Sequence, residues 1–309
     1  MSKKAFVFPG QGSQFVGMGK DVYHMYPEAK DIFDRANEIM GLDLAKICFS
    51  GPEEKLKQTQ ITQPAIYVHS MAVYEILKNK NCQPDAVAGH SLGEYSALVA
   101  AGALSFEDGL KLVKIRGELM QKAGIERPGT MAALIGLDPD QVNDICMSVK
   151  DVGIVCAANY NSPGQVAISG EVEAVHAAME VAKEQGARRA VELVVSGAFH
   201  SPLMQAAQDG LAQALGETNI CDTQMPIYSN VSASATNAAI KIRDLLFKQL
   251  SHPVRWVEII QNMTAAGINV FYEVGPGKVL TGLIKRIDNN VTGSAIGDID
   301  TIEKLSIDL

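Results

Sequence analysis

Short apolar runs and longer stretches with helical spacing alternate along most of the chain. The runs predict strands at 4–8, 86–88, 225–231 and 269–274. The stretches predict helices at 25–40, 65–78, 94–101, 105–121, 202–215, 238–249 and 256–266, with one more after Lys278. Strands that alternate with helices are typical of a parallel sheet covered by helices on both faces. The pattern therefore predicts an α/β protein.

The segment from Thr59 to Pro64 interrupts the helical pattern and is predicted as a loop. Proline has no backbone N–H and is tolerated in the first turn of a helix but not in its interior. Pro64 is therefore expected to lie at the start of the helix that follows.

The period changes after Thr130, where strands and helices become shorter and closer together. Strands are predicted at 131–136, 152–159, 165–169 and 189–195, and helices at 139–149 and 171–185. The residues from Tyr160 to Gly164 read as the hairpin turn between the second and third strands. The order βαββαβ is that of a ferredoxin-like unit. We expect residues 129–196 to form a small domain of this kind, inserted into a larger one.

Composition narrows the protein class. The chain has 309 residues, a net charge of −8 and 47% hydrophobic residues, which suits one large α/β domain with an insert. The acidic charge argues against nucleic acid or an anionic membrane as a partner. No apolar run is long enough for a signal peptide or a membrane span. The chain has five cysteines, an odd number, and none of them has C-x-x-C spacing. We therefore expect reduced thiols, no zinc site and a cytoplasmic location.

The segment Gly89-His90-Ser91-Leu92-Gly93 lies between a predicted strand and a predicted helix. In this context the G-x-S-x-G pattern presents the serine at the tip of a turn too tight for side chains. The free N–H groups of the helix start would then face an oxyanion formed on attack at a carbonyl. Ser91 is therefore a candidate nucleophile. The alternative is a glycine turn that happens to contain serine.

Three further features are ambiguous by themselves. Gly10-Gln11-Gly12 follows the first strand and fits a second oxyanion donor or an ordinary βα loop; no lysine follows at P-loop spacing. Arg116 lies within an apolar helical stripe, where a guanidinium needs an anionic partner; the alternatives are an internal salt bridge or an arginine that reaches past the core to water. Among six histidines, His200 precedes a helix start, where the helix dipole favours the neutral ring that a base needs. A structural histidine is the alternative.

Four segments in this order and spacing resemble the acyltransferase family of fatty-acid and polyketide synthesis: Phe8–Gln14, Gly89–Tyr95, Ala198–Ser201 and Glu273–Leu280. The resemblance covers the whole chain. It implies an α/β-hydrolase-like large domain, 1–128 and 197–309, that carries the ferredoxin-like insert 129–196. It also implies transfer of a malonyl group from malonyl-CoA to acyl carrier protein, with no cofactor and no metal. The sequence leaves the oligomeric state open, and we expect a monomer.

The resemblance also assigns roles to residues. Ser91 would be the nucleophile, His200 its base, and the backbone carbonyl of Gln249 would orient the histidine in place of an acid. The N–H groups of Gln11 and Leu92 would form the oxyanion hole. Arg116 would bind the malonyl carboxylate. The remaining residues expected to line the site are His90, Gln63, Asn159 and Phe199.

An acidic carrier protein would need a local basic surface on this acidic chain. Candidates are Arg188, Arg189, Lys285 and Arg286, which otherwise are ordinary surface charges. Two other functions remain as alternatives. A serine thioesterase or esterase would share Ser91 and His200 but has no use for Arg116. A non-catalytic scaffold is the second, and the intact set of Ser91, His200 and Arg116 argues against it. A discrete acyltransferase of polyketide synthesis would look almost the same.

Overall fold

A computed structural model describes residues 2–308 and contains two sheets. The larger sheet has the order β10-β9-β1-β2-β7-β8, and only β8 runs antiparallel to its neighbour. Its strands are β1 (Lys3–Phe8), β2 (Ala86–Gly89), β7 (Ile227–Tyr228), β8 (Ala235–Thr236), β9 (Ile268–Val274) and β10 (Thr292–Ile296). The predicted parallel α/β architecture is confirmed.

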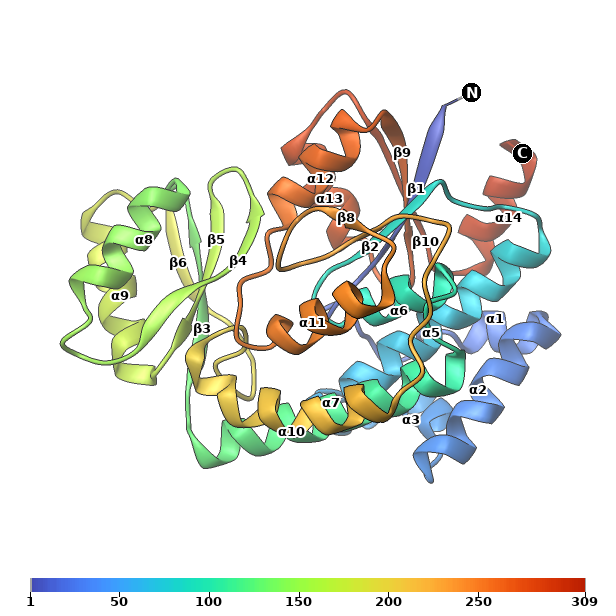
Figure 1. The fold of residues 1–309 in the computed structure, drawn as a ribbon, viewed down its shortest axis with the longest axis horizontal. Coiled ribbons are helices and arrows are strands. Elements are labelled where there is room, and N and C mark those ends of the chain that lie inside the picture. The colour runs from blue at the N-terminus through green and yellow to red at the C-terminus, as the bar shows by residue number, and fades with distance from the viewer. Residues whose placement is uncertain (1, 309) are drawn as a thin grey trace.

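Helices cover both faces of this sheet (Figure 1). They are α1 (Lys20–Met25), α2 (Pro27–Met40), α3 (Leu44–Ser50), α4 (Glu53–Leu56), α5 (Thr59–Asn79), α6 (Gly93–Ala100), α7 (Phe106–Glu126), α10 (Gln205–Glu217) after the 3-10 turn Pro202–Met204, α11 (Ala239–Gln249), α12 (Trp256–Ala265), α13 (Val279–Ile287) and α14 (Ile299–Asp308). Side chains alternate along β1 between the faces. Phe6 and Phe8 pack with α2, α5 and α7, whereas Ala5 and Val7 pack with α12 and α13.

The second sheet is antiparallel and has the order β4-β5-β3-β6. It is formed by β3 (Thr130–Ile135), β4 (Val155–Ser162), β5 (Gln165–Gly170) and β6 (Arg189–Glu192), with α8 (Pro139–Ser148) and α9 (Val172–Glu184). The predicted βαββαβ order is present, and a separate apolar cluster forms its core. These elements extend to one side of the parallel sheet in Figure 1.

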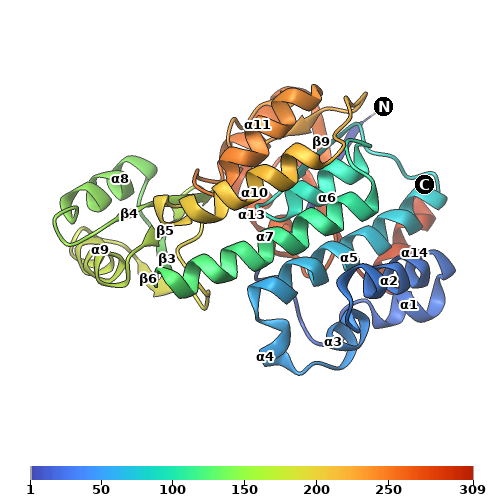
Figure 2. The ribbon, with the colours of Figure 1, turned by 60° about the horizontal axis from the view of Figure 1, so that its bottom comes forward.

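One strand of the smaller sheet reaches back to the larger part. The N–H of Tyr160 in β4 donates to the carbonyl of Val254, 2.9 Å away, and the N–H of Val254 donates to the carbonyl of Ala158 at 2.8 Å. Figure 2 shows the other connection, where α7 and α10 run side by side towards the insert. The far end of β4 is thus held against the segment before α12.

Two predictions about elements are wrong. Thr59 to Pro64 is not a loop, because α5 begins at Thr59 and contains Pro64 in its second turn. Packing outweighs the lost hydrogen bond: Gly117 of α7 lets the start of α5 approach so closely that a Cβ there would lie 3.0 Å from the Cα of Gln60. The hairpin turn is also shorter than predicted, because β4 continues to Ser162.

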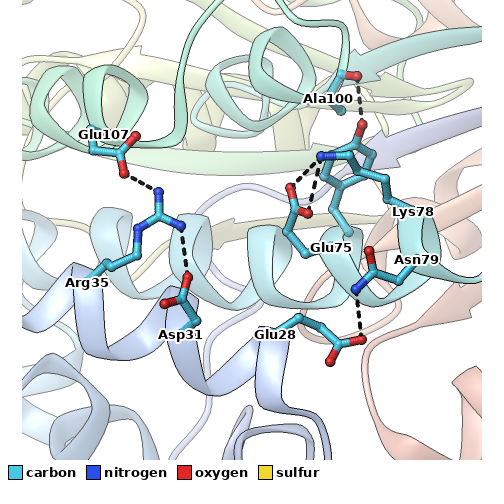
Figure 3. Close-up of polar contacts among 9 residues, drawn as sticks. Glu28, Asp31, Arg35, Glu75, Lys78, Asn79, Ala100 and Glu107 are labelled. Atoms are coloured by element: carbon cyan, nitrogen blue, oxygen red, sulfur yellow. Dashed lines mark hydrogen bonds and ion pairs between the residues drawn. The ribbon is translucent and has the colours of Figure 1, made fainter.

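Polar contacts join the helices on one side of the sheet (Figure 3). Arg35 of α2 lies between Asp31, on its own helix, and Glu107 at the start of α7. Asn79, the last residue of α5, donates from Nδ2 to Oε1 of Glu28 at 3.2 Å. These groups are largely exposed, so each contact contributes about 1 kcal/mol or less. Within residues 2–308, no helix is both long enough and apolar enough to cross a membrane.

Candidate active site

Ser91 lies at the tip of the turn between β2 and α6, as predicted, although the helix begins two residues after it. Its φ is +51°, in the left-handed region that non-glycine residues rarely adopt. A Cβ on Gly89 would lie 1.9 Å from the carbonyl carbon of Gly93, and a Cβ on Gly93 would lie 2.0 Å from the carbonyl oxygen of Phe8. Both glycines are therefore required by close backbone contacts.

Ser91 and His200 form a hydrogen-bonded pair. Ser91 Oγ lies 2.7 Å from His200 Nε2. On the other side of the ring, Nδ1 lies 2.9 Å from the carbonyl oxygen of Gln249 and 3.1 Å from that of His252. Because carbonyl oxygens only accept hydrogen bonds, Nδ1 carries the proton and Nε2 is free to accept from the Ser91 hydroxyl. Two carbonyls thus do the orienting that an acid does in a triad.

The surroundings of His200 keep its ring neutral. Burial is the largest cause and lowers the pKa of His200 to about 3, and the nearby Arg116 guanidinium acts in the same direction. The carbonyl of Gln249 opposes this effect but does not reverse it. At neutral pH the ring therefore has an unprotonated Nε2, which is the form a general base requires.

Arg116 is 1% exposed and forms no ion pair among the described residues. Its guanidinium donates to Gln63 Oε1 at 2.7 Å, to Ser91 Oγ at 3.0 Å and to Gln249 Oε1 at 3.0 Å. All three acceptors are uncharged, and burial lowers the pKa of Arg116 from its ordinary value. A buried cation beside the nucleophile without a carboxylate partner is a site for an anionic group of a ligand.

Two residues with unpaired backbone N–H groups line the same space. Gln11 follows β1, Leu92 precedes α6, and both residues line the cavity that contains Ser91 Oγ. Within residues 2–308, neither N–H has a hydrogen-bond partner. A Cβ on Gly10 would lie 2.5 Å from the carbonyl oxygen of His90, so this glycine lets the Gln11 loop approach the turn. Two unpaired N–H groups beside a nucleophile are the arrangement that stabilises an oxyanion.

These groups open into a cavity of about 740 Å³ between the two sheets. A cavity of this size accommodates a ligand of several hundred daltons. Of the predicted lining residues, His90, Asn159 and Phe199 lie on its wall. Gln63 does not; it is fully buried behind Arg116, where it and the equally buried Gln249 hold the guanidinium.

Three residues near the site were not predicted. Asn161 Oδ1 accepts from His90 Nε2 at 2.8 Å, and it was missed because its segment was assigned to a turn. Asn230 Oδ1 accepts from the N–H of Ser91 at 2.6 Å. Glu94 is 2% exposed and accepts from Gln249 Nε2 at 2.6 Å. The available sequence signal for Glu94 was its place directly after the G-x-S-x-G pattern, at the start of an otherwise mostly apolar helix.

The four basic candidates are all exposed and lie outside the cavity lining. Arg286 nevertheless donates to Oε1 of Gln165, a lining residue, at 2.7 Å. Gln165 pairs across the sheet with Ile135, which pairs with Arg189. Arg286 of α13 therefore lies beside the cavity wall, and Arg189 of β6 lies two strands further along the smaller sheet. In the described part of the chain, no group of three or more His, Cys, Asp or Glu side chains is arranged to hold a metal ion.

Comparison with known proteins agrees with this geometry. A family model for the acyl transferase domain matches residues 5–295. The malonyl CoA-acyl carrier protein transacylase of Bacillus subtilis (strain 168) is 47% identical over 304 residues, which cover 98% of this chain and 96% of that protein. The crystal structure of an acyl carrier protein S-malonyltransferase from Vibrio cholerae O1 biovar eltor has a TM-score of 0.95 at 44% identity and covers 98% of this chain and 100% of the other.

A malonyl-transacylase solved in complex with its type II PKS acyl-carrier protein has a TM-score of 0.97 at 42% identity, with 100% of both chains covered. The sequence and the structure both agree with these proteins over nearly the full length, and this agreement determines the family. The chain belongs to the acyl transferase family, among the malonyl CoA-acyl carrier protein transacylases.

Proposed function

We propose that this protein transfers the malonyl group of malonyl-CoA to the phosphopantetheine thiol of acyl carrier protein, and so supplies extender units for fatty acid synthesis. The observation that carries the proposal is a serine and histidine pair beside a buried arginine that has no anionic partner in the described residues. The names of the relatives support the same substrates.

The first half-reaction acylates Ser91. His200 Nε2 takes the hydroxyl proton while Oγ attacks the thioester carbonyl, and the N–H groups of Gln11 and Leu92 receive the oxyanion. Each such donor contributes about 3 kcal/mol to a transition state of this kind. The carbon–sulfur bond then breaks, His200 returns the proton to the departing CoA thiolate, and the malonyl-Ser91 ester remains.

The second half-reaction repeats these steps with a different nucleophile. The thiol of the carrier protein gives its proton to His200, and its sulfur attacks the ester carbonyl in the same oxyanion hole. Ser91 leaves and regains the proton from His200. Because a thioester and an ester of similar energy are exchanged, the transfer is reversible, and the cavity must exclude water to avoid hydrolysis.

Arg116 provides selectivity in this scheme. A malonyl carboxylate can pair with the guanidinium in bidentate fashion, whereas an acetyl group would leave the buried cation unpaired. Discrimination is large when the wrong substrate leaves a buried polar group without a partner. His90, Asn159 and Phe199 would shape the wall against which the acyl group and the pantetheine arm lie.

The finer architecture fits this function. The sharp turn after β2 in a mainly parallel sheet supports an α/β-hydrolase-like large domain, 1–128 and 197–309. The strand order β4-β5-β3-β6 supports a ferredoxin-like insert, 129–196. The five cysteines are all unpaired, which supports a cytoplasmic location. The monomeric state stays a prediction, as does the absence of a cofactor. CoA enters only as part of the substrate.

Carrier protein would dock at the mouth of the cavity. We expect this docking surface to include the exposed residues Arg188, Arg189, Lys285 and Arg286, and the contact of Arg286 with Gln165 on the cavity wall supports this. Complementary charge of this kind steers an acidic partner and sets its orientation.

Intact mass after acid quench tests the proposal. The protein is mixed with malonyl-CoA alone, and a stoichiometric malonyl adduct on Ser91 that discharges on addition of holo carrier protein is expected. Ser91→Ala is the control and should carry no adduct. Free malonate without a lasting adduct would mean that water is the acceptor and the protein is a hydrolase. The absence of both adduct and turnover would contradict the transferase and favour a scaffold.

A further inference from the structure

A closed ring of hydrogen bonds lies behind the nucleophile. Asn230 Oδ1 accepts from the N–H of Ser91 at 2.6 Å, and the N–H of Asn230 donates to Glu94 Oε2 at 3.2 Å. The same carboxylate oxygen accepts from Gln249 Nε2 at 2.6 Å, and this amide also donates to the carbonyl of Ser91 at 3.0 Å. The ring thus includes both the N–H and the carbonyl of Ser91.

The side chains of the ring are removed from water. Asn230 and Gln249 are 0% exposed, and Glu94 is 2% exposed. Among the described residues Glu94 forms no ion pair. Burying a carboxylate is costly: burial raises the pKa of this carboxyl, and the hydrogen bond from Gln249 and the nearby charge of Arg116 oppose that rise only in part. Because burial of this carboxylate destabilises the fold, we look for its role in the active site.

Asn230 acts on the turn that carries Ser91. Besides receiving the Ser91 N–H, its Nδ2 donates to the carbonyl of Gly89 at 2.6 Å. It therefore bridges the two peptide groups on the N-terminal side of a residue held at a φ of +51°. Such a backbone conformation persists only when its surroundings hold it.

Glu94 acts on the substrate-binding cation. A carboxylate can only accept from Gln249, so it forces the NH₂ end of that amide inward and the oxygen end towards Arg116. Gln249 Oε1 then accepts from Arg116 Nη2 at 3.0 Å, the same nitrogen that donates to Ser91 Oγ. If the amide rotated by half a turn, its NH₂ group would face the guanidinium and repel it.

We propose that Asn230 and Glu94 are positioning residues for the acyl transfer: Asn230 holds the strained turn of the nucleophile, and Glu94 aims Arg116 at the malonyl carboxylate by fixing the amide of Gln249. This inference rests on the proposed function. The two residues are expected to differ in their main effect. Asn230 acts directly on Ser91 for any acyl group, whereas Glu94 reaches Ser91 only through Asn230 and Gln249 and acts chiefly through Arg116, for an acyl group with a carboxylate.

The test measures the second-order rate of acyl-enzyme formation by quenched-flow mass spectrometry, with malonyl-CoA and acetyl-CoA as probes. The variants are Asn230→Ala, Glu94→Ala and Glu94→Gln. Ser96→Ala is the matched control, because Ser96 is buried on the same helix and its hydroxyl has no partner in the described residues. Melting temperatures establish that each variant is folded.

Asn230→Ala should slow acylation by both substrates by a similar factor, about 100-fold for a nucleophile displaced by about 1 Å. Glu94→Ala should slow malonyl transfer by more than tenfold and leave acetyl transfer within about threefold, so that the preference for malonyl falls. Glu94→Gln keeps an acceptor oxygen and should restore the preference, which a merely structural role would not predict.

Two results would overturn the inference, provided that the wild-type protein still forms the malonyl adduct. The first is an equal loss of the malonyl and acetyl acylation rates in Glu94→Ala. The second is loss of the malonyl preference in folded Glu94→Gln, which would show that the charge of Glu94 matters rather than the orientation of the Gln249 amide. If Glu94→Ala does not fold, Glu94→Gln and Asn230→Ala decide alone. Failure of wild type to load would instead count against the proposed function.

Discussion

Arg116 combines near-complete burial with uncharged neighbours. Gln63, Ser91 and Gln249 each accept a hydrogen bond from its guanidinium, but none supplies a negative charge. Its place on an apolar stripe was visible in the sequence, and so was its need for an anion. The choice between a core acid and a substrate depended on which side chains of other elements surround it, and only the folded chain determines these.

Replacing Arg116 by alanine should therefore invert the acyl preference. Malonyl transfer should fall by roughly 100- to 1,000-fold, as expected when one partner of a buried charge pair worth about 3–4 kcal/mol is removed. Acetyl transfer should be kept or should rise, because no cation is left unpaired. Steady-state rates with both CoA esters check this. Arg243→Ala, a half-buried arginine outside the cavity lining, is the control. A surviving malonyl preference would show that another group binds the carboxylate.

At the scale of elements, the turn from β2 to α6 must satisfy two requirements: close backbone packing and the correct position of Ser91. Gly89 and Gly93 allow backbone to touch backbone, and the turn sets Ser91 Oγ 2.7 Å from His200 Nε2. The G-x-S-x-G pattern indicated this turn from five residues because the Gly89–Gly93 contact is local, although the Gly93 contact with Phe8 of β1 is not. Helix α5 is the opposite case, since packing of Gly117 against its first turn outweighs the local preference of Pro64.

Gly93→Ala should disable the turn. The new Cβ would lie 2.0 Å from the carbonyl oxygen of Phe8, and a backbone atom of a central strand cannot move aside. We expect loss of about 1–3 kcal/mol of unfolding free energy from overpacking and at least 100-fold slower acylation. Urea denaturation and the mass assay measure the two effects.

Gly216→Ala is the matched control, because nothing lies within 4 Å of the position that the new methyl group would take in α10. It should keep full activity and gain about 0.5–1 kcal/mol from helix propensity. Equal behaviour of the two alanine variants would mean that close packing at Gly93 is not needed.

At the scale of the whole molecule, the cavity exists because two sheets of different kinds are held together. The backbone bonds between β4 and Val254 bring Asn159 and Asn161 of the insert to the cavity edge near His90. The same arrangement joins Arg286 of α13 to Gln165 on the cavity wall, so this part of the surface carries a basic group. A net charge of −8 makes that local surface an exception on this molecule.

Reversing these charges should weaken carrier-protein binding. A variant with Glu at all four basic positions should raise the carrier-protein KM about tenfold or more and reduce its dependence on salt. The control reverses four exposed lysines that lie outside the mouth: Lys20, Lys46, Lys80 and Lys241. An unchanged KM in the first variant would place docking on another surface.

The sequence by itself determined the features that arise from neighbours in the chain. These include the alternation of strands and helices, the βαββαβ order of the insert, and the tight turn at Ser91, because periodicity and glycine sterics act over a few residues. Motif order also pointed to His200, although no acid for it could be found.

Only the tertiary structure decided what depends on groups far apart in the chain. The carbonyls of Gln249 and His252 orient His200 in place of an acid, and burial among distant elements keeps its ring neutral. Asn230 and Glu94 join the site through contacts that span more than 130 residues of sequence. Hydrogen bonds and desolvation are properties of atoms in space, so no local pattern of residues can specify them.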